Sequence, residues 1–448
     1  MNYALTFIRS LEANQYKFSG EKVLKFFSNP EVIAIYLAVV LLLVALLASA
    51  ILVSLHLVRK STDRLPEDIN DLLSEARDIQ KNQQPKQSIG NSRFPQLAKI
   101  DEELHFVQPM AYASCPLDEL CERFRNFAAG NLGLYYDIAD IRRFIAGMGI
   151  SKLVILRGIS GTGKTSLAYA AGEFFGNSST VVPIQPMWKE RSDMIGYFNE
   201  FTKKFNETTM LCKLYEAGGR ADVYITVLDE VNISRIEYYF AEFLSLLELP
   251  DASKRYVDVV ADSWKNDPER IQNGKLLLPE NMWFIGTANN DDSTFAISDK
   301  VYDRAAVIDL ERKCAPFPCE SSSACHISYW QLTQLFEQAK KAYALSDESR
   351  RKLARLDAYM SDVFRVSFGN RIMKQIEAYI PIMIACGGSE AEALDDLLAR
   401  KILRKLEQLS PAFVKNESDG LLALLDELFG IKTLRQSREY IDKLRKGY

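Results

Sequence analysis

The hydrophobic pattern begins with one long apolar run near the N-terminus. It extends from Val32 to Val58, reads VIAIYLAVVLLLVALLASAILVSLHLV, and contains no Asp, Glu, Lys or Arg. A helix of this length, at about 1.5 Å per residue, exceeds the ~30 Å hydrocarbon core of a bilayer. The run lacks the polar stripe of a core helix and starts too late for a cleavable signal peptide. It predicts one transmembrane helix over residues 32–58, preceded by a short segment, residues 1–31.

A spacer is predicted after this run, over residues 59–114. Between Pro66 and Lys81 the apolar residues fall at helical spacing with charges between them, which indicates a short amphipathic stalk helix. The stretch from Gln83 to Pro95, QQPKQSIGNSRFP, is polar and holds two prolines, which is typical of a linker.

From residue 115 the pattern alternates between short apolar runs and helical periodicity. Alternation of this kind predicts an α/β domain over residues 115–325, with a parallel sheet covered by helices on both faces. We expect helices at Thr165–Phe175 and Glu237–Leu247, the second of them a buried interface helix. After residue 325 only helical patterns remain, which predicts a helical lid over residues 326–448. The predicted strands are Leu153–Leu156, Thr180–Ile184, Val223–Leu228, Met282–Gly286 and Ala306–Leu310.

Charge and cysteine content narrow the function classes. The formal net charge of −4 over 448 residues argues against broad, sequence-independent binding of nucleic acid. It does not exclude a local basic groove, because net charge does not report how charges are distributed. The seven cysteines are irregularly spaced, which favours reduced thiols over a disulfide framework. For three of these cysteines, the alternative is a metal cluster of Cys314, Cys319 and Cys325 with His326, but their spacing lacks the usual C-x2-C turns.

A phosphate-binding loop follows the first predicted strand. The strand LVIL leads into GISGTGKT and then a helix, which is the G-x-x-x-x-G-K-[ST] pattern in its strand–loop–helix context. Backbone N–H groups of such a loop, together with the helix N-terminus, attract phosphate oxygens. Lys164 is expected to reach the β- and γ-phosphates, and Thr165 to bind Mg²⁺. The predicted nucleotide-binding positions are Gly158, Ser160, Gly161, Thr162, Gly163, Lys164, Thr165 and Ser166.

Two further strands end in residues that complete a hydrolytic site. The strand VYITVL ends in Asp229 and Glu230, at the edge where parallel sheets bind ligands. Asp229 is expected to hold Mg²⁺ through water, and Glu230 to orient and deprotonate the attacking water. The strand WFIGT leads to Asn289, whose amide can contact both the γ-phosphate and that water, although a plain turn residue is the alternative.

These motifs, in this order, resemble those of AAA+ ATPases. The segments LDEVNISR, GTANNDDST and ISDKVYDRA are similar to the McrB/MoxR-like branch, which includes motors of modification-dependent restriction systems. The resemblance covers roughly residues 116–410. It implies Arg304 as the arginine finger that acts on the neighbouring subunit's site, and Arg371 as the sensor-2 arginine that touches the γ-phosphate from the lid. Arg365 is the competing candidate for sensor 2.

The resemblance also implies a partner and a reaction. A finger in trans requires a homo-oligomer, and a hexameric ring is expected. ATP is the expected nucleotide and GTP the alternative. We expect hydrolysis to drive remodelling or translocation of a macromolecule by a single-pass membrane protein with its ATPase domain in the cytoplasm. The alternatives are a nucleotide-controlled scaffold or switch, and a motor of a defence system with a separate nuclease. The position of Trp188, Lys189, Arg191 and Tyr197 in such rings suggests substrate contact in a pore, with plain packing as the alternative for Trp188 and Tyr197.

Overall fold

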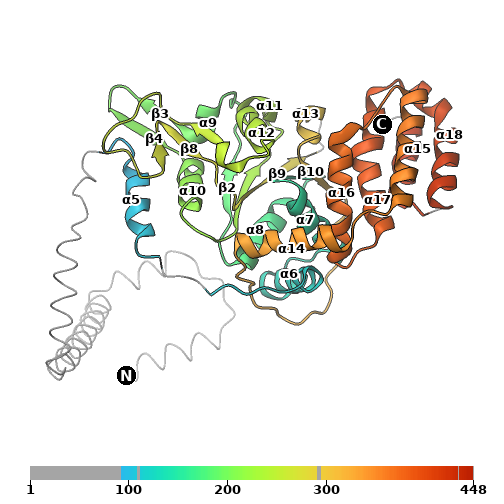
Figure 1. The fold of residues 1–448 in the computed structure, drawn as a ribbon, viewed down its shortest axis with the longest axis horizontal. Coiled ribbons are helices and arrows are strands. Elements are labelled where there is room, and N and C mark those ends of the chain that lie inside the picture. Colours follow the sequence, from blue (N-terminus) through green and yellow to red (C-terminus); the bar gives the residue numbers. More distant parts are fainter. Residues whose placement is uncertain (1–91, 108–110, 290–293, 432, 447–448) are drawn as a thin grey trace, which may run out of the picture. The chain divides into compact units, whose positions relative to one another are not determined.

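The computed structural model describes residues 92–107, 111–289, 294–431 and 433–446. The predicted membrane segment Val32–Val58 and the predicted stalk, residues 66–81, lie outside this set. Within the described ranges, no helix is both long and apolar enough to cross a bilayer. The described chain is a mixed α/β domain with a C-terminal helical region (Figure 1).

A five-stranded parallel sheet forms the centre, which confirms the predicted α/β class. Consecutive side chains of its middle strands point to opposite faces, and both faces are buried. Val154 and Leu156 pack in a first core on one face, and Leu153 and Ile155 pack in a second core on the other face. The strands, in spatial order, are β10 (Ala306–Asp309), β1 (Leu153–Gly158), β9 (Met282–Asn289), β5 (Tyr224–Asp229) and β2 (Thr180–Pro183).

Helices cover both faces of this sheet. The first core lies under α6 (Leu117–Leu132), α7 (Ile138–Ile150) and α8 (Lys164–Phe175). Helices of the second core include α5 (Pro95–Leu104), α9 (Arg191–Ile195), α10 (Thr209–Ala217), α11 (Ile236–Tyr239) and α12 (Ala241–Leu247). The expected single helix Glu237–Leu247 is therefore two helices, because the chain bends at Phe240, which is fully buried.

Two small antiparallel sheets interrupt the α/β alternation. They occupy stretches in which the hydrophobic pattern gave no strand, because their strands are only two to four residues long. The first is the hairpin β3 (Gly196–Asn199) and β4 (Lys204–Glu207). The second contains β6 (Tyr256–Asp258), β8 (Lys275–Leu277) and β7 (Ile271–Gln272), with the short η2 turn (Ala252–Lys254) before it.

The folded part starts earlier than the sequence predicted. Residues 92–104 were expected to belong to the linker, yet α5 packs in the second core through fully buried Leu97. Arg93, almost completely buried, pairs with Asp262 and Asp267 at 2.8 Å each. These ion pairs join residues about 170 positions apart and are set by tertiary structure, so a polar sequence with two prolines could not indicate them.

Most of the C-terminal helices gather beyond the β10 edge of the sheet, whereas the first of them passes beneath α7 and α8 in this view (Figure 1). They share the first core with α7, and the approach is close at Gly149, where a Cβ would meet Ile382 at 2.6 Å and Phe336 at 3.0 Å. The helices are α14 (Tyr329–Ala342), α15 (Asp347–Phe364), α16 (Gly369–Ala385), α17 (Glu390–Leu397), α18 (Pro411–Phe429) and α19 (Arg435–Lys446). The π-helical turn η3 (Leu398–Ile402) and the 3-10 helix η4 (Leu403–Gln408) join α17 to α18, and α13 (Asp299–Tyr302) precedes β10.

Candidate functional site

The loop between β1 and α8 has the geometry of a phosphate cradle. Gly163 is the N-cap of α8 and has a φ of +91°, a conformation that strains other residues. A Cβ at Gly163 would also lie 3.2 Å from the hydroxyl oxygen of Tyr136, which donates a hydrogen bond to the Gly163 carbonyl at 3.0 Å. The loop therefore needs glycine here and leaves the N–H groups of the first turn of α8 for a ligand.

Lys164 is held within this loop. Its side chain is buried, and Nζ donates to the carbonyls of Gly158 at 3.0 Å and Ile159 at 2.8 Å. Thr162 Oγ1 also donates to the Ile159 carbonyl, at 3.0 Å, while Ser160 and Gly161 are exposed at the tip. Ser166 lies on the first turn of α8, where its hydrogen bond opposes the raised pKa that burial gives Tyr136.

Asp229 joins the loop to the neighbouring strands. Its Oδ1 accepts hydrogen bonds from Thr165 Oγ1 at 2.8 Å and from Thr287 Oγ1 at 2.7 Å. The predicted metal-binding pair, Thr165 and Asp229, is therefore brought together across 64 residues of sequence. Hydroxyl and carboxylate oxygens are ligands that suit Mg²⁺, so the donor set fits the predicted ion.

Glu230 and Asn289 face each other at the ends of β5 and β9. Glu230 has a φ of +56°, an uncommon value for a residue with a Cβ, and its side chain is exposed. Its backbone N–H donates to Thr287 Oγ1 at 2.9 Å, which holds this conformation. The Asn289 amide lies 3.4 Å from Glu230 Oε1. The arrangement presents a carboxylate and an amide side by side at the same sheet edge as the loop.

Sequence reasoning missed two residues that hold this arrangement. Thr287 contacts both acidic residues, as described above. Asn232 binds Asn289 twice, because its Nδ2 donates to the Asn289 carbonyl at 2.8 Å and its Oδ1 accepts from the Asn289 N–H at 3.3 Å. The period of two along a strand could have indicated Thr287, since it shares a face with Asn289. No local signal indicated Asn232.

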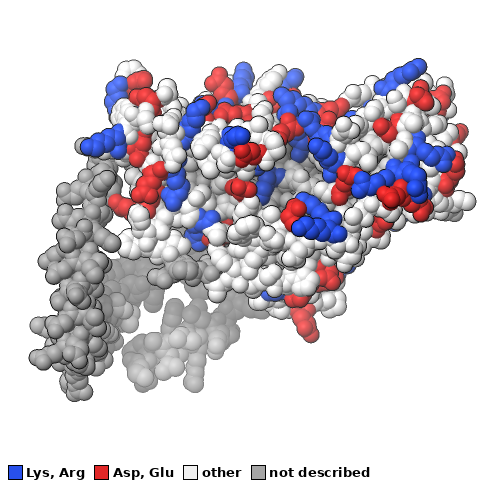
Figure 2. Space-filling view, viewed as in Figure 1, with Lys and Arg blue, Asp and Glu red and all other residues white. Residues whose placement is uncertain are grey.

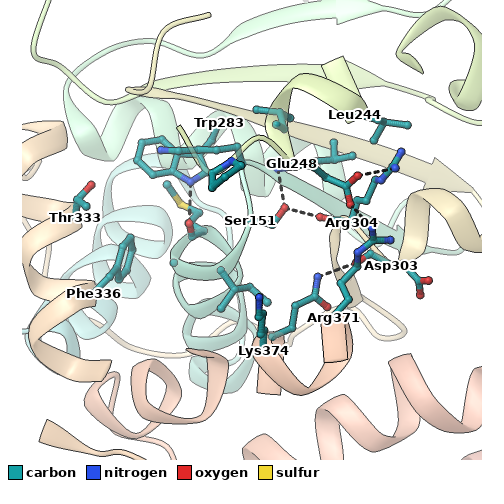
Figure 3. A pocket seen from close by; sticks show the side chains of 18 of the residues that line it. Ser151, Leu244, Glu248, Trp283, Asp303, Arg304, Thr333, Phe336, Arg371 and Lys374 are labelled. Carbon is teal, nitrogen blue, oxygen red and sulfur yellow. Dashed lines mark hydrogen bonds and ion pairs between the residues drawn. The ribbon is translucent and has the colours of Figure 1, made fainter. Parts of the chain in front are cut away.

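Arg304 and Arg371 lie together (Figure 3). They lie at the end of the sheet where the parallel strands begin, away from the phosphate-binding loop. The loop follows the end of β1, whereas Arg304 precedes β10, a parallel strand. Both arginines pair with Glu248, from Arg304 Nη2 to Oε2 at 2.6 Å and from Arg371 Nη2 to Oε1 at 2.7 Å. The length of the six-residue strand β1, roughly 15–20 Å, separates the two arginines from the phosphate-binding loop of the same chain.

The expected contact of Arg371 with the γ-phosphate stays a prediction. In the structure α16 starts at Gly369 near Arg304, and Arg371 points to the same end of the sheet as Arg304. Its alternative, Arg365, ends α15 and is exposed. Arg371 therefore lies with Arg304 at the start of β10, on the side of the sheet away from the phosphate-binding loop.

The two arginines border a cavity of about 920 Å³. Basic side chains are frequent around it, and Figure 2 shows Lys and Arg gathered between α12 and α16, with acidic residues among them. Lys152 lies in its wall with Nζ 3.2 Å from the centre of the Trp283 ring, and burial lowers the pKa of this lysine well below its ordinary value. The cavity thus combines a buried amine with several exposed cations.

The expected pore residues divide into packed and exposed side chains. Trp188 packs edge-on against Tyr239 with ring centres 5.8 Å apart, and Arg191 pairs with Glu242 at 2.8 Å. Lys189 is exposed, and Tyr197 on β3 is 55% exposed. Trp188 and Arg191 are half-buried and have partners within the domain, whereas Lys189 and Tyr197 are exposed.

The cysteine–histidine run does not gather into one site. Cys314 lies 3.5 Å from an Asp137 oxygen, whereas Cys325 is buried beside Cys115, whose hydrogen bond lowers the pKa of Cys325 to about 7. All seven cysteines are free. In the described ranges, no group of three or more His, Cys, Asp or Glu side chains could hold a metal ion.

Comparisons with known proteins identify only part of the chain. Residues 325–448 match a domain of unknown function, DUF8727. No curated protein matches. Similar solved structures include a candidate ATPase from Cytophaga hutchinsonii, at 11% identity and a TM-score of 0.39, covering 71% of this chain and 93% of that chain. A full-length MCM homolog from Methanopyrus kandleri aligns at 10% identity and a TM-score of 0.37, covering 64% of this chain and 62% of that one. Similarity at this level leaves function to be argued from the site.

Proposed function

We propose that this chain is an AAA+-type ATPase that binds ATP and Mg²⁺ at the loop of residues 158–165 and hydrolyses the γ-phosphate bond. One observation supports this most strongly, namely the hydrogen-bonded chain Thr165–Asp229–Thr287–Glu230, which fixes the Asp229 carboxylate and the backbone of Glu230 beside the loop. Fixed oxygen ligands next to a phosphate cradle suit phosphoryl transfer, in which positioning and charge neutralisation supply most of the rate.

Each residue has a task in this proposal. The loop N–H groups and Lys164 bind the phosphate oxygens, and Thr165 and Asp229 hold the ion. Bound Mg²⁺ would neutralise charge on the β- and γ-phosphates. Glu230 accepts the proton of the attacking water, and Asn289 orients that water from the adjacent strand end. The left-handed conformation of Glu230 favours this role, because strained backbone is often retained at active sites.

A complete site requires a second copy of the chain. Arg304 lies at the sheet edge remote from its own loop, so a finger role is open to it only toward a neighbour's nucleotide. Its guanidinium bonds Glu248 through Nη2, while Nε and Nη1 have no acceptor within the described residues. Arg371 shares that edge and would approach the same phosphates. We therefore propose a homo-oligomer, with a hexameric ring as its form.

The proposal also covers the location of this ATPase and the work that hydrolysis performs. We propose membership of the McrB/MoxR-like branch, anchoring by the apolar run Val32–Val58 in a membrane, and a cytoplasmic ATPase domain, since ATP is available there. The energy of hydrolysis would serve to remodel or translocate a macromolecule at the membrane. Lys189 and Tyr197, which are exposed, are the proposed substrate contacts.

Two variants test the chemical proposal. Lys164→Ala should lose nucleotide binding, whereas Glu230→Gln should bind ATP normally and lose most turnover, because only the proton acceptor is removed. Binding is measured with a fluorescent ATP analogue and turnover by phosphate release. The control is Glu348→Gln, an acid at the start of α15 that pairs with Lys352 at 2.7 Å. Wild-type turnover by Glu230→Gln would exclude the assigned mechanism.

A further inference from the structure

The helical region holds the backbone on both sides of Arg304. Lys401 Nζ, from the π-helical turn η3, donates to the carbonyls of Tyr302 and Ala305, the latter at 2.5 Å. One side chain therefore binds the peptide groups that flank the predicted finger. These two bonds join positions almost 100 residues apart in sequence, so they depend entirely on how the helical region packs against β10.

The two carbonyls between them are also bound. Gln375 Nε2 from α16 donates to the Asp303 carbonyl at 2.8 Å, and Ser151 Oγ donates to the Arg304 carbonyl at 2.8 Å. Figure 3 shows Ser151 and Arg304 side by side. Four successive carbonyls thus have side-chain donors, and the helical region supplies three of these four bonds. Such dense support is typical of a segment whose position matters for function.

Burial makes Lys401 an unusual choice for plain packing. The residue is only 5% exposed, and an amine in such surroundings costs free energy that an apolar side chain would avoid. Burial lowers its pKa to about 7, with Asp303 opposing and Arg404 and Lys405 adding to this shift. Lys401 also lies on a π-helical turn, a distortion often found at functional sites. The hydrogen bonds from Lys401 to the carbonyls of Tyr302 and Ala305 offset this unfavourable burial.

The neighbouring residue of the same turn holds the other end of β10. Arg400 Nε lies 3.2 Å from Asp309 Oδ2, and Asp309 also pairs with Arg157 at 2.7 Å, directly before the phosphate-binding loop. Adjacent residues of η3 therefore contact both the start and the end of one short strand. The helical region is therefore connected, through β10, both to the phosphate-binding loop and to the segment that carries Arg304.

We propose that Lys401, assisted by Gln375, is a positioning residue for Arg304, so that the helical region matching DUF8727 sets the finger that acts on the neighbouring subunit. This inference rests on the proposed ATPase function and adds the residues that place its trans-acting cation. Lys401 does not contact nucleotide. It acts through the backbone that carries the Arg304 side chain.

The main test is Lys401→Met, which keeps the length of the side chain and removes its donor. A displacement of about 1 Å in a catalytic group costs about 10²-fold in rate, so kcat should fall by roughly 10- to 100-fold. KM for ATP and nucleotide binding should stay unchanged, because the loop of the same subunit is intact. The matched control is Lys405→Met, a lysine on η4 that donates to the Ser367 carbonyl at 3.1 Å and leaves the finger untouched.

Mixing variants separates finger placement from general damage. Lys401→Met should regain activity when mixed with Lys164→Ala, because the second variant supplies an intact finger and the first an intact loop. It should not regain activity when mixed with Arg304→Ala, since neither partner then offers a functional finger. Equal recovery in both mixtures, or a rise in KM in place of the fall in kcat, would overturn the proposal.

Hydrogen exchange gives a readout that does not need hydrolysis. Amides of residues 302–306 should exchange faster in Lys401→Met than in the wild type, with no change in Lys405→Met. Gln375→Leu removes only the hydrogen bond to the Asp303 carbonyl, so the exchange rates should increase less. This variant replaces Lys401→Met in the experiment if Lys401→Met does not fold. Unchanged exchange in both variants would refute the positioning role. A wild-type chain without ATPase activity whose exchange still responds to Lys401→Met would instead refute the proposed function and leave the positioning contact standing.

Discussion

Thr287→Val is the sharpest test of the active-site geometry, because it removes one hydroxyl and keeps the shape of the side chain. That hydroxyl donates to Asp229 Oδ1 at 2.7 Å and accepts from the Glu230 N–H at 2.9 Å. Thr287 is only 2% exposed, so water cannot replace either bond. Valine therefore leaves a carboxylate with one donor fewer and a backbone N–H without its acceptor.

The expected magnitude follows from these two bonds. A hydrogen bond to a charged group contributes about 1.5–3 kcal/mol and a neutral one about 1 kcal/mol, so the free energy of unfolding should fall by about 2–4 kcal/mol. Turnover should also fall in the molecules that remain folded, because the position of Glu230 depends on the same hydroxyl. Glu230 keeps its φ of +56° partly through its bond to Thr287, and a relaxed Glu230 would shift its carboxylate. A shift of about 1 Å would lower kcat by about 10²-fold.

The assay compares three variants with the wild type by urea unfolding, ATP binding and phosphate release. Thr287→Ser retains the hydroxyl and should turn over ATP within a few-fold of the wild-type rate. Thr226→Val is the matched control, since Thr226 is 1% exposed on neighbouring β5 and, within the described residues, forms no side-chain hydrogen bond with Asp229 or Glu230. Thr287→Val with wild-type turnover would refute the reasoning, because the two carboxylates would then not depend on this hydroxyl for their positions.

Three further predictions concern assembly, the membrane and pH. Arg304→Ala should lose about 10³–10⁵-fold in turnover while binding ATP normally, and mixing it with Lys164→Ala should restore activity; a normal rate for Arg304→Ala alone would contradict the finger assignment. A truncated chain starting at Leu65 should be soluble and bind nucleotide, whereas release of the full-length chain from membranes by carbonate would exclude a spanning helix. Burial lowers the pKa of Lys401 to about 7, so between this value and the ordinary 10.5 the unfolded chain binds a proton that the folded chain lacks. Over that window the unfolding free energy of the wild type, relative to Lys401→Met, should rise with pH by up to about 1.4 kcal/mol per unit; a flat difference would show that the pKa of Lys401 is not lowered.

The sequence alone determined the class of the domain and the residues of the loop edge. The strands appear as short continuous apolar runs and the helices as a period of 3.6, and all five central strands were predicted within a few residues. Lys164, Thr165, Asp229 and Glu230 could be identified because each stands in a short motif at the end of a strand. Parallel strands bring such ends to one edge.

Tertiary structure alone decided which side chains support those residues and where the arginines point. Arg371 pairs with Glu248 because of the way α16 packs, and no local pattern in the sequence records that packing. The contacts of Arg93, Asn232 and Lys401 join residues about 60 to 170 positions apart. Hydrogen bonds and buried ion pairs of this range form only after the cores have brought their elements together, so their partners cannot be read from neighbouring residues.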